Sequence, residues 1–246
     1  MAAIRRLVMT VVSAISVAVL VSVGASDAAA VGSHPITRAP NHKISNSTST
    51  NWSGYAVTGG RYTTVRSTWV QPAVTCNGTA YSSFWVGIDG DTSGTVEQTG
   101  TEADCNGSTP VYSAWYEMYP KFPVNYPNPV APGDHFTGTV TTDGKGNFTL
   151  TLSNTTRNWT QSVAKRLKSA KLASAEVIAE APSSSGGVLP LANFGTVSFS
   201  GATVNGATLT SSTPGLDAIT MQSGSTVKAQ PSGISSGSFS VTWKHS

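Results

Sequence analysis

The stretch SSFWVGIDG, residues 82–90, is the part of the sequence that most directly indicates the fold. Successive side chains of a strand point to opposite faces. In this stretch Phe84, Val86 and Ile88 therefore share one face, and Trp85, Gly87 and Asp89 share the other. One face is entirely apolar, whereas the other carries an indole and a carboxylate. The alternation predicts a strand whose apolar face packs on a core.

Similar short runs, separated by Gly, Pro, Asn or Asp, recur along the chain from residue 51 onward. We expect strands at residues 52–57, 62–70, 82–88, 95–99, 111–119, 135–142, 147–152, 158–163, 173–180, 193–199, 208–211, 218–221, 226–229 and 238–243. Residues 163–180 are rich in Ala, Lys and Leu, and propensity alone favours a helix there. Regularly spaced strands with turn residues between them predict a single all-β domain, an antiparallel β-sandwich.

The composition excludes several classes of protein. Only 11% of the 246 residues are charged and the formal net charge is +3, against about 25% charged residues in an ordinary globular protein. So few basic residues do not suit a nucleic-acid groove, which must neutralise many phosphates. The 39% apolar content argues against disorder.

The N-terminus has the pattern of a secretory signal peptide. Arg5-Arg6 precede the apolar residues 7–25, and the small residues Ala28-Ala29-Ala30 follow. We expect cleavage after residue 30 and a secreted protein with no membrane partner, although an uncleaved apolar segment of this length could serve as a membrane anchor. Residues 31–49 lack periodicity and are interpreted as a flexible leader or a short propeptide, followed by the domain at residues 50–246.

The two cysteines, Cys76 and Cys105, are expected to form one disulfide, because secretion exposes them to an oxidising environment. No His or carboxylate residues stand at the spacing of a zinc finger from the two cysteines, so we expect no metal and no cofactor.

Two local motifs are interpreted as turns. Residues 233–237 match the G-x-S-x-G pattern but lie in a Ser/Gly-rich stretch without the strand and helix that a nucleophile elbow needs. Residues 89–94 resemble the start of a calcium loop, yet the position of the bidentate glutamate is Gly100.

The few acidic residues gather on one face of the predicted strands. In four segments without Lys or Arg, every second residue forms a face that carries acids: residues 85–89 (Trp and Asp), 98–102 (Gln and Glu), 115–119 (Trp, Glu and Tyr) and 176–180 (two Glu). A solvated outer face would also carry carboxylates. Without counter-charges, however, a cluster of carboxyl groups should have raised pKa values, and this favours a functional site.

The same segments resemble the eqolisins, a family of glutamic endopeptidases. The matching pieces, in the order found in that family, are Asn51-Trp52-Ser53-Gly54-Tyr55, Phe84-Trp85-Val86-Gly87-Ile88-Asp89-Gly90, Glu97-Gln98-Thr99-Gly100-Thr101-Glu102, Ala114-Trp115-Tyr116-Glu117-Met118-Tyr119-Pro120 and Ala175-Glu176-Val177-Ile178-Ala179-Glu180-Ala181-Pro182. The resemblance implies a sandwich of two large sheets of about seven strands each, of the concanavalin A-like lectin/glucanase type. It also implies a strand, not a helix, at residues 173–180.

By position in these motifs, the catalytic pair of the family falls on Gln98 and Glu180. The positions that match its substrate cleft are Trp52, Trp85, Asp89, Glu102 and Glu117, to which we add Trp115 and Tyr119 because they share a predicted face with Glu117. The sequence departs from the family at Glu102, where an aspartate is frequent, and at Val177, where an aromatic residue is frequent. The pI of about 8.9 is also unusual for the family.

The resemblance implies a secreted, monomeric enzyme that cleaves polypeptides, with an acidic optimum. Glu180 would act as general base toward water and Gln98 would orient that water and stabilise the oxyanion. Two alternatives stay open at this point. A β-sandwich glycoside hydrolase could use Glu117 and Glu180, and a lectin-like binding module would need no catalytic residue.

Overall fold

The computed structural model describes residues 36–45 and 47–246, so the predicted signal peptide and the first residues of the leader lie outside the described part. All regular secondary structure within these residues is β. Residues 163–180, with their conflicting propensities, end one strand, turn at residues 168–169 and form the next strand from residue 174. Tertiary pairing on both edges of that strand overrides the helix propensity.

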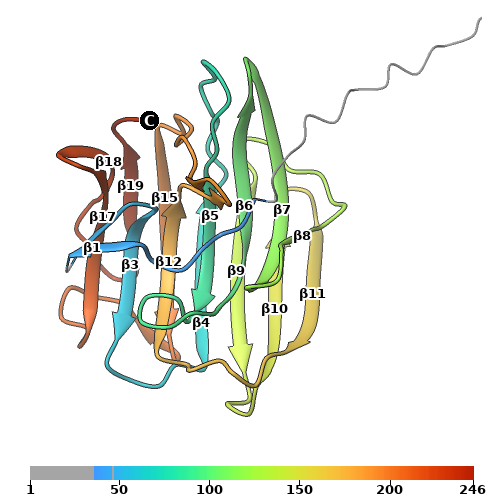
Figure 1. Ribbon diagram of the computed structural model, residues 1–246. Helices are drawn as coiled ribbons and strands as arrows, with labels where there is room; N and C mark the ends of the chain where they lie inside the picture. The colour runs from blue at the N-terminus through green and yellow to red at the C-terminus, as the bar shows by residue number, and fades with distance from the viewer. Residues whose placement is uncertain (1–35, 46) are drawn as a thin grey trace, which may run out of the picture. The chain divides into compact units, whose positions relative to one another are not determined.

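Seven strands form what we call the front sheet (Figure 1). Their spatial order, as the pairings define it, is β17 (Leu216–Ser223), β3 (Trp52–Thr58), β12 (Ser174–Glu180), β5 (Ser83–Ile88), β6 (Val96–Asn106), β7 (Thr109–Tyr119) and β8 (Val124–Asn125). All of these pairings are antiparallel.

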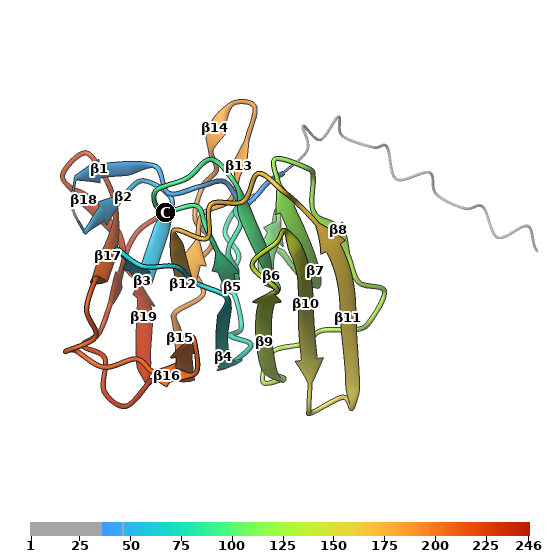
Figure 2. The same ribbon diagram turned by 90° about the horizontal axis from the view of Figure 1, so that it is seen from below.

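The back sheet lies behind the front sheet, and the rotated view shows the two layers (Figure 2). Its order is β11 (Trp159–Arg166), β10 (Asn147–Asn154), β9 (His135–Thr142), β4 (Thr64–Val70), β15 (Thr196–Val204), β19 (Phe239–Trp243), β18 (Thr226–Pro231) and β17. Because β17 pairs in both sheets, it joins the two layers at one edge. The predicted antiparallel sandwich of two large sheets is therefore confirmed.

Five short strands complete the described part of the chain: β1 (Lys43–Ser45), β2 (Thr48–Ser49), β13 (Ser183–Ser184), β14 (Gly187–Val188) and β16 (Ala207–Thr208). β2 runs parallel to β17, unlike the pairings of the two large sheets. The strand predicted at residues 208–211 is wrong beyond residue 208, because a turn closed by the Thr213 N–H to the Thr210 carbonyl begins there. Residues 233–237 form the expected turn, bridged between Ser235 and Ser238.

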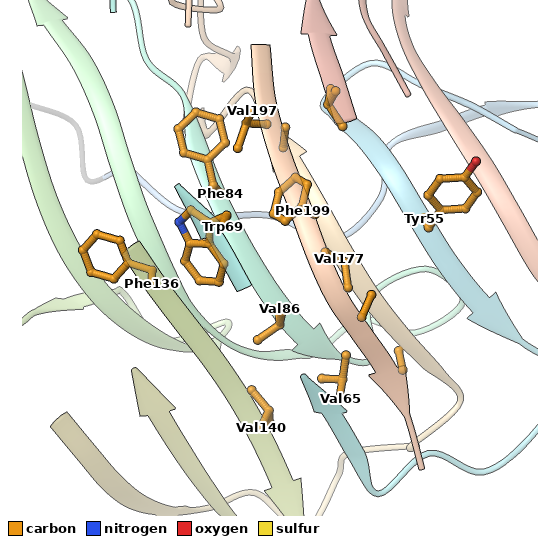
Figure 3. Close-up of a cluster of buried hydrophobic side chains, with 14 of the residues drawn as sticks. Tyr55, Val65, Trp69, Phe84, Val86, Phe136, Val140, Val177, Val197 and Phe199 are labelled. Atoms are coloured by element: carbon orange, nitrogen blue, oxygen red, sulfur yellow. The ribbon is translucent and has the colours of Figure 1, made fainter. Parts of the chain in front are cut away.

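The main core fills the space between the two sheets (Figure 3). Its centre is Trp69 of the back sheet, whose ring stacks on Phe136 with a centroid separation of 5.9 Å. The front sheet contributes Phe84, Val86 and Ile88, all fully buried. These are the residues that the alternation in SSFWVGIDG placed on the apolar face, so this prediction is confirmed.

A second apolar cluster lies on the other side of the front sheet. We call it the outer cluster; it consists of Trp52, Ala56, Trp85, Val96, Trp115, Ile178 and Ile219. Every one of these side chains is fully buried. An N-terminal segment, residues 36–43, crosses strands β3, β12, β5 and β6 on this side, as the blue trace in Figure 1 shows. The outer face of the front sheet is therefore covered by the protein's own chain.

Among residues 36–45 and 47–246 there is no helix that is long and apolar enough to cross a membrane.

Cys76 and Cys105 form the predicted disulfide, which ties the loop before β5 to the end of β6. The two residues are 29 apart in the sequence, and a loop of this size is worth about 3–4 kcal/mol in the chain-entropy model. We expect reduction to lower the Tm by roughly 10 °C. Calorimetry with and without reductant measures this, and an unchanged Tm would contradict a stabilising role.

Candidate active site

Gln98 and Glu180 lie on the same face of the front sheet. Gln98 on β6 is paired with Gly87 on β5, and Glu180 at the end of β12 is paired with Ser83 on β5. Directly paired residues of antiparallel strands share a face, and so do residues two apart on a strand. Both side chains therefore point to the side of the outer cluster, and both are fully buried.

The indole of Trp85 lies between the predicted catalytic side chains. Its Nε1 donates to Glu180 Oε2 at 2.8 Å. A Cβ atom at Gly87 would come within 2.8 Å of the Trp85 ring and 3.2 Å of Gln98 Cβ. Glycine at position 87 thus lets the indole lie flat over the sheet against Gln98. Trp52 packs edge-on against the same ring, with the centroids 5.0 Å apart.

The N-terminal segment binds directly to Gln98. Gln98 Nε2 donates to the backbone carbonyl of Arg38 at 2.7 Å and lies 3.3 Å from Glu117 Oε2. The backbone N–H of Arg38 donates to the same Glu117 oxygen at 2.9 Å. Gln98 Oε1 has no hydrogen-bond partner among the residues that the structure describes. The amide group therefore holds a peptide carbonyl with its nitrogen while its oxygen stays available as an acceptor.

Asn51 connects the same segment to Glu180. Its Nδ2 lies 3.4 Å from Glu180 Oε1 and donates to the carbonyl of Pro40 at 3.1 Å. It also lies 3.4 Å from the Ala39 carbonyl, which accepts from Trp52 Nε1 at 3.0 Å. Residues 38–40 thus lie between Gln98 on one side and the Asn51–Glu180 pair on the other. Asn51 is the residue before Trp52 in the first matching motif, and nothing else in the sequence marks it as a contact of Glu180.

Burial dominates the electrostatics of this site. It raises the pKa of Glu180 well above its ordinary value, and the nearby Glu117 carboxyl raises it further, whereas the Arg38 guanidinium opposes the shift. Burial likewise raises the pKa of Glu117 to about 8 and that of Asp104 to about 7. The pKa values are raised, as expected from the sequence, but the main cause is desolvation; a like charge contributes only at Glu180, and Arg38 is a counter-charge that opposes all three shifts.

A separate group of acids surrounds Glu176, on the same strand as Glu180. Burial raises the pKa of Glu176 well above its ordinary value, and Asp91, Asp89 and Glu97 add to the shift. Glu180 instead responds to Glu117 and Arg38. The two glutamates of β12 therefore belong to different environments, and Glu180 is the one that shares its surroundings with Gln98.

Asp89, which the sequence places among the cleft residues, holds the loop before β12. Its carboxylate accepts backbone N–H groups from Lys171, Leu172 and Ala173, each at 2.8 Å. The residue itself turns the chain at the end of β5 with φ of 70°. Asp89 thereby fixes the loop that leads into β12. No group of three or more His, Cys, Asp or Glu side chains that could hold a metal ion occurs in the described part of the chain.

The remaining predicted residues meet around the side chain of Arg38. Its guanidinium forms an ion pair with Glu102 and lies 4.4 Å from the ring centroid of Trp115. Tyr119 is partly buried and packs against the outer cluster. The structure thus brings Trp52, Trp85, Gln98, Glu102, Trp115, Glu117 and Glu180 together on one face of the front sheet.

An antiparallel sandwich with buried carboxyl, amide and indole groups on its outer face is the combination expected of a glutamic peptidase. The model of the peptidase A4 family matches residues 50–243, and the chain belongs to that family. The expected membership among the eqolisins is confirmed by this family match together with the relatives and solved structures described below.

Two curated relatives match part of the chain. Aspergillopepsin-2 of Aspergillus niger is 29% identical over 181 residues, which are 63% of this chain and 64% of that protein. Scytalidopepsin B of Scytalidium lignicola is 36% identical over 104 residues, which are 41% of this chain and 39% of that protein. The chain thus spans less than two thirds of the length of either relative.

The solved structures match more completely. Scytalido-glutamic peptidase, crystallised with a transition-state analogue inhibitor, superposes with a TM-score of 0.70 and 26% identity, covering 79% of this chain and 98% of that one. Aspergilloglutamic peptidase from Aspergillus niger gives a TM-score of 0.60 and 28% identity, covering 67% of this chain and 99% of that one.

Proposed function

We propose that this protein is a secreted glutamic endopeptidase that cleaves polypeptides at acidic pH with Gln98 and Glu180. One observation carries the proposal: Gln98 Nε2 donates at 2.7 Å to a backbone carbonyl of an extended peptide, the N-terminal segment. That carbonyl, of Arg38, stands in for the scissile carbonyl of a substrate. The peptide bond after it leads to Ala39, whose carbonyl lies beside the Asn51 that contacts Glu180.

The reaction follows from the chemistry of the two side chains. Ionised Glu180 takes a proton from a water molecule, and the hydroxide formed attacks the carbonyl carbon. Gln98 Nε2 donates to the oxygen as negative charge develops on it, while Gln98 Oε1 accepts from the attacking water. Glu180 then gives its proton to the amide nitrogen, the C–N bond breaks, and a carboxylic acid and an amine leave. An amide suits the position beside the oxyanion because it carries no charge at any pH.

Residues 31–49 act, in this proposal, as a propeptide that must leave before a substrate can bind. Support comes from the contacts of the described part of the leader, which occupies the donor of Gln98 and, through the Pro40 carbonyl, binds the Asn51 that contacts Glu180. Release of the segment would admit water and lower the pKa of Glu180, because desolvation is the main cause of its upward shift. The base would then be ionised at acidic pH. Secretion is supported by the signal-peptide pattern and by the disulfide.

The proposal is tested by measuring the cleavage of denatured casein between pH 2 and 7 by the parent protein and by the Gln98→Ala variant. Removal of one oxyanion donor typically lowers the rate by about 10²–10³-fold, and we expect a loss of that size with an unchanged circular dichroism spectrum. Incubation with β-glucans and other polysaccharides distinguishes the glycoside hydrolase, which needs no glutamine. Casein cleavage that survives in Gln98→Ala would contradict the proposed pair.

A further inference from the structure

We infer that Glu102 and Trp115 form a subsite that selects a basic side chain, arginine above all, in the substrate residue whose carbonyl is bound by Gln98. This inference rests on the proposed function and names the specificity of the same site. In the structure the arginine is that of the protein's own leader, Arg38. We call Glu102, Trp115 and Glu117 the arginine site.

The side chain of Arg38 is held as a ligand would be. An exposure of 2% shows that the arginine is almost completely enclosed. Its guanidinium pairs with Glu102 and lies on the face of the Trp115 indole at 4.4 Å. The second Glu102 oxygen is oriented by the Ser113 hydroxyl, which donates to it at 2.9 Å. The planar guanidinium can meet a carboxylate and stack on an indole at the same time, which an ammonium group cannot do equally well.

The main chain of Arg38 is bound by neighbouring groups. Gln98 holds its carbonyl at 2.7 Å and Glu117 accepts its N–H at 2.9 Å. Glu117 Oε1 and Trp115 Nε1, both buried, have no hydrogen-bond partner among the described residues. The arginine site therefore recognises the same residue whose carbonyl is polarised, and it retains polar atoms for further contacts.

Electrostatics favours the same type of ligand. The guanidinium forms its ion pair with Glu102, and Glu117, Asp104 and Glu180 are further carboxyl groups that act on it. When the leader departs, Glu102 loses its ionic partner. A substrate residue with an apolar side chain would leave the Glu102 carboxylate buried and unpaired, which is costly. Glutamate, being longer than the aspartate frequent in the family, reaches one methylene further toward this ligand.

The first experiment needs no catalysis. In the full chain carrying Glu180→Gln, hydrogen exchange by mass spectrometry measures the protection of residues 37–41. We expect Arg38→Leu and Glu102→Gln each to lower that protection at least about tenfold, the double variant to lower it no further than either single one, and Arg38→Lys to keep part of it. The matched control is Arg61→Leu, because Arg61 is an exposed arginine that donates to the Gly144 carbonyl.

The second experiment measures kcat/KM on four peptides, Ac-Ile-Thr-Xaa-Ala-Ala-Asn with Xaa as Arg, Lys, Leu or Glu. We expect cleavage after Xaa, with Arg preferred to Leu at least about tenfold, and a smaller Arg/Leu ratio in Glu102→Gln. Cleavage of the Leu peptide as fast as the Arg peptide would overturn the inference and leave the proposed function intact. If no peptide is cleaved, the proposed function is wrong. The exchange experiment then tests the arginine site by itself, and unchanged protection in Arg38→Leu and Glu102→Gln overturns that site.

Discussion

Replacement of Glu180 by glutamine is expected to lower kcat/KM on casein-derived peptides by about 10³–10⁴-fold, the upper part of the range for loss of a general acid–base group. Glutamine has the size of glutamate and can still accept from Trp85 Nε1 through its one oxygen, although its NH2 group cannot accept from Asn51 Nδ2. It cannot take a proton from water or return one to the amine. The loss should therefore appear in kcat, with a Tm equal to or above that of the parent chain, because a buried carboxyl group is removed.

The matched control for this prediction is Glu176→Gln. Glu176 is on the same strand, points to the same face and is equally buried, but its neighbours are Asp89, Asp91 and Glu97. We expect Glu176→Gln to keep activity within a few-fold of the parent. If Glu176→Gln abolishes activity and Glu180→Gln does not, the general base is Glu176 and not Glu180.

Sequence alone was sufficient for the two faces of the front sheet. The alternation of apolar and polar residues in 82–90 and 174–180 is a local property of a strand, and pairing of β5 with β12 and β6 then brings Gln98 and Glu180 to one side. Period-2 alternation could not decide residues 163–180, where β11 and β12 are held by their neighbours against local helix propensity.

The contacts of the N-terminal segment could not be predicted, because they join residues far apart in the chain. Arg38 lies 60 residues from Gln98 and 79 from Glu117. No periodicity marks residues 36–43, so their sequence indicated a flexible leader. Asp89 lies two residues after Gly87 and is placed at the site for that reason. Its φ of 70° turns the chain out of the strand, and its carboxylate accepts from the backbone of residues 171–173, contacts that alternation does not indicate.

The protein is expected to become less stable as pH rises, opposite to the usual behaviour of acidic groups in salt bridges. Burial raises the pKa of Glu97 to about 9 and that of Glu117 to about 8. In the unfolded chain these groups titrate near 4.5. Between these values the folded state holds protons that the unfolded state has released. These groups therefore make their full contribution to the free energy of unfolding below about pH 4.5, and this contribution decreases as pH rises toward 9.

The size of this fall in stability depends on the pKa shifts and on the number of buried carboxyl groups whose pKa is raised. One pKa unit corresponds to about 1.4 kcal/mol, so the shift of Glu97 alone corresponds to about 6 kcal/mol, and Asp104, Glu176 and Glu180 shift in the same direction. His42 and Lys228, whose pKa values are lowered by burial, act in the opposite direction, but they are fewer than the shifted carboxyl groups. We expect the Tm to fall by at least roughly 10–20 °C between pH 4 and pH 9, which is the fall that the Glu97 shift alone would cause.

Calorimetry across this pH range, in the Gln98→Ala chain so that self-cleavage does not interfere, measures the fall. Glu97→Gln isolates one contribution, since it removes a titrating group whose side chain is fully buried while keeping its size. The substitution should raise the Tm at pH 8–9 and change it little at pH 4, which flattens the profile. A Tm that instead increases from pH 4 to pH 8 would mean that the buried carboxyl groups are ionised in the folded protein and are held by charge pairing rather than by desolvation.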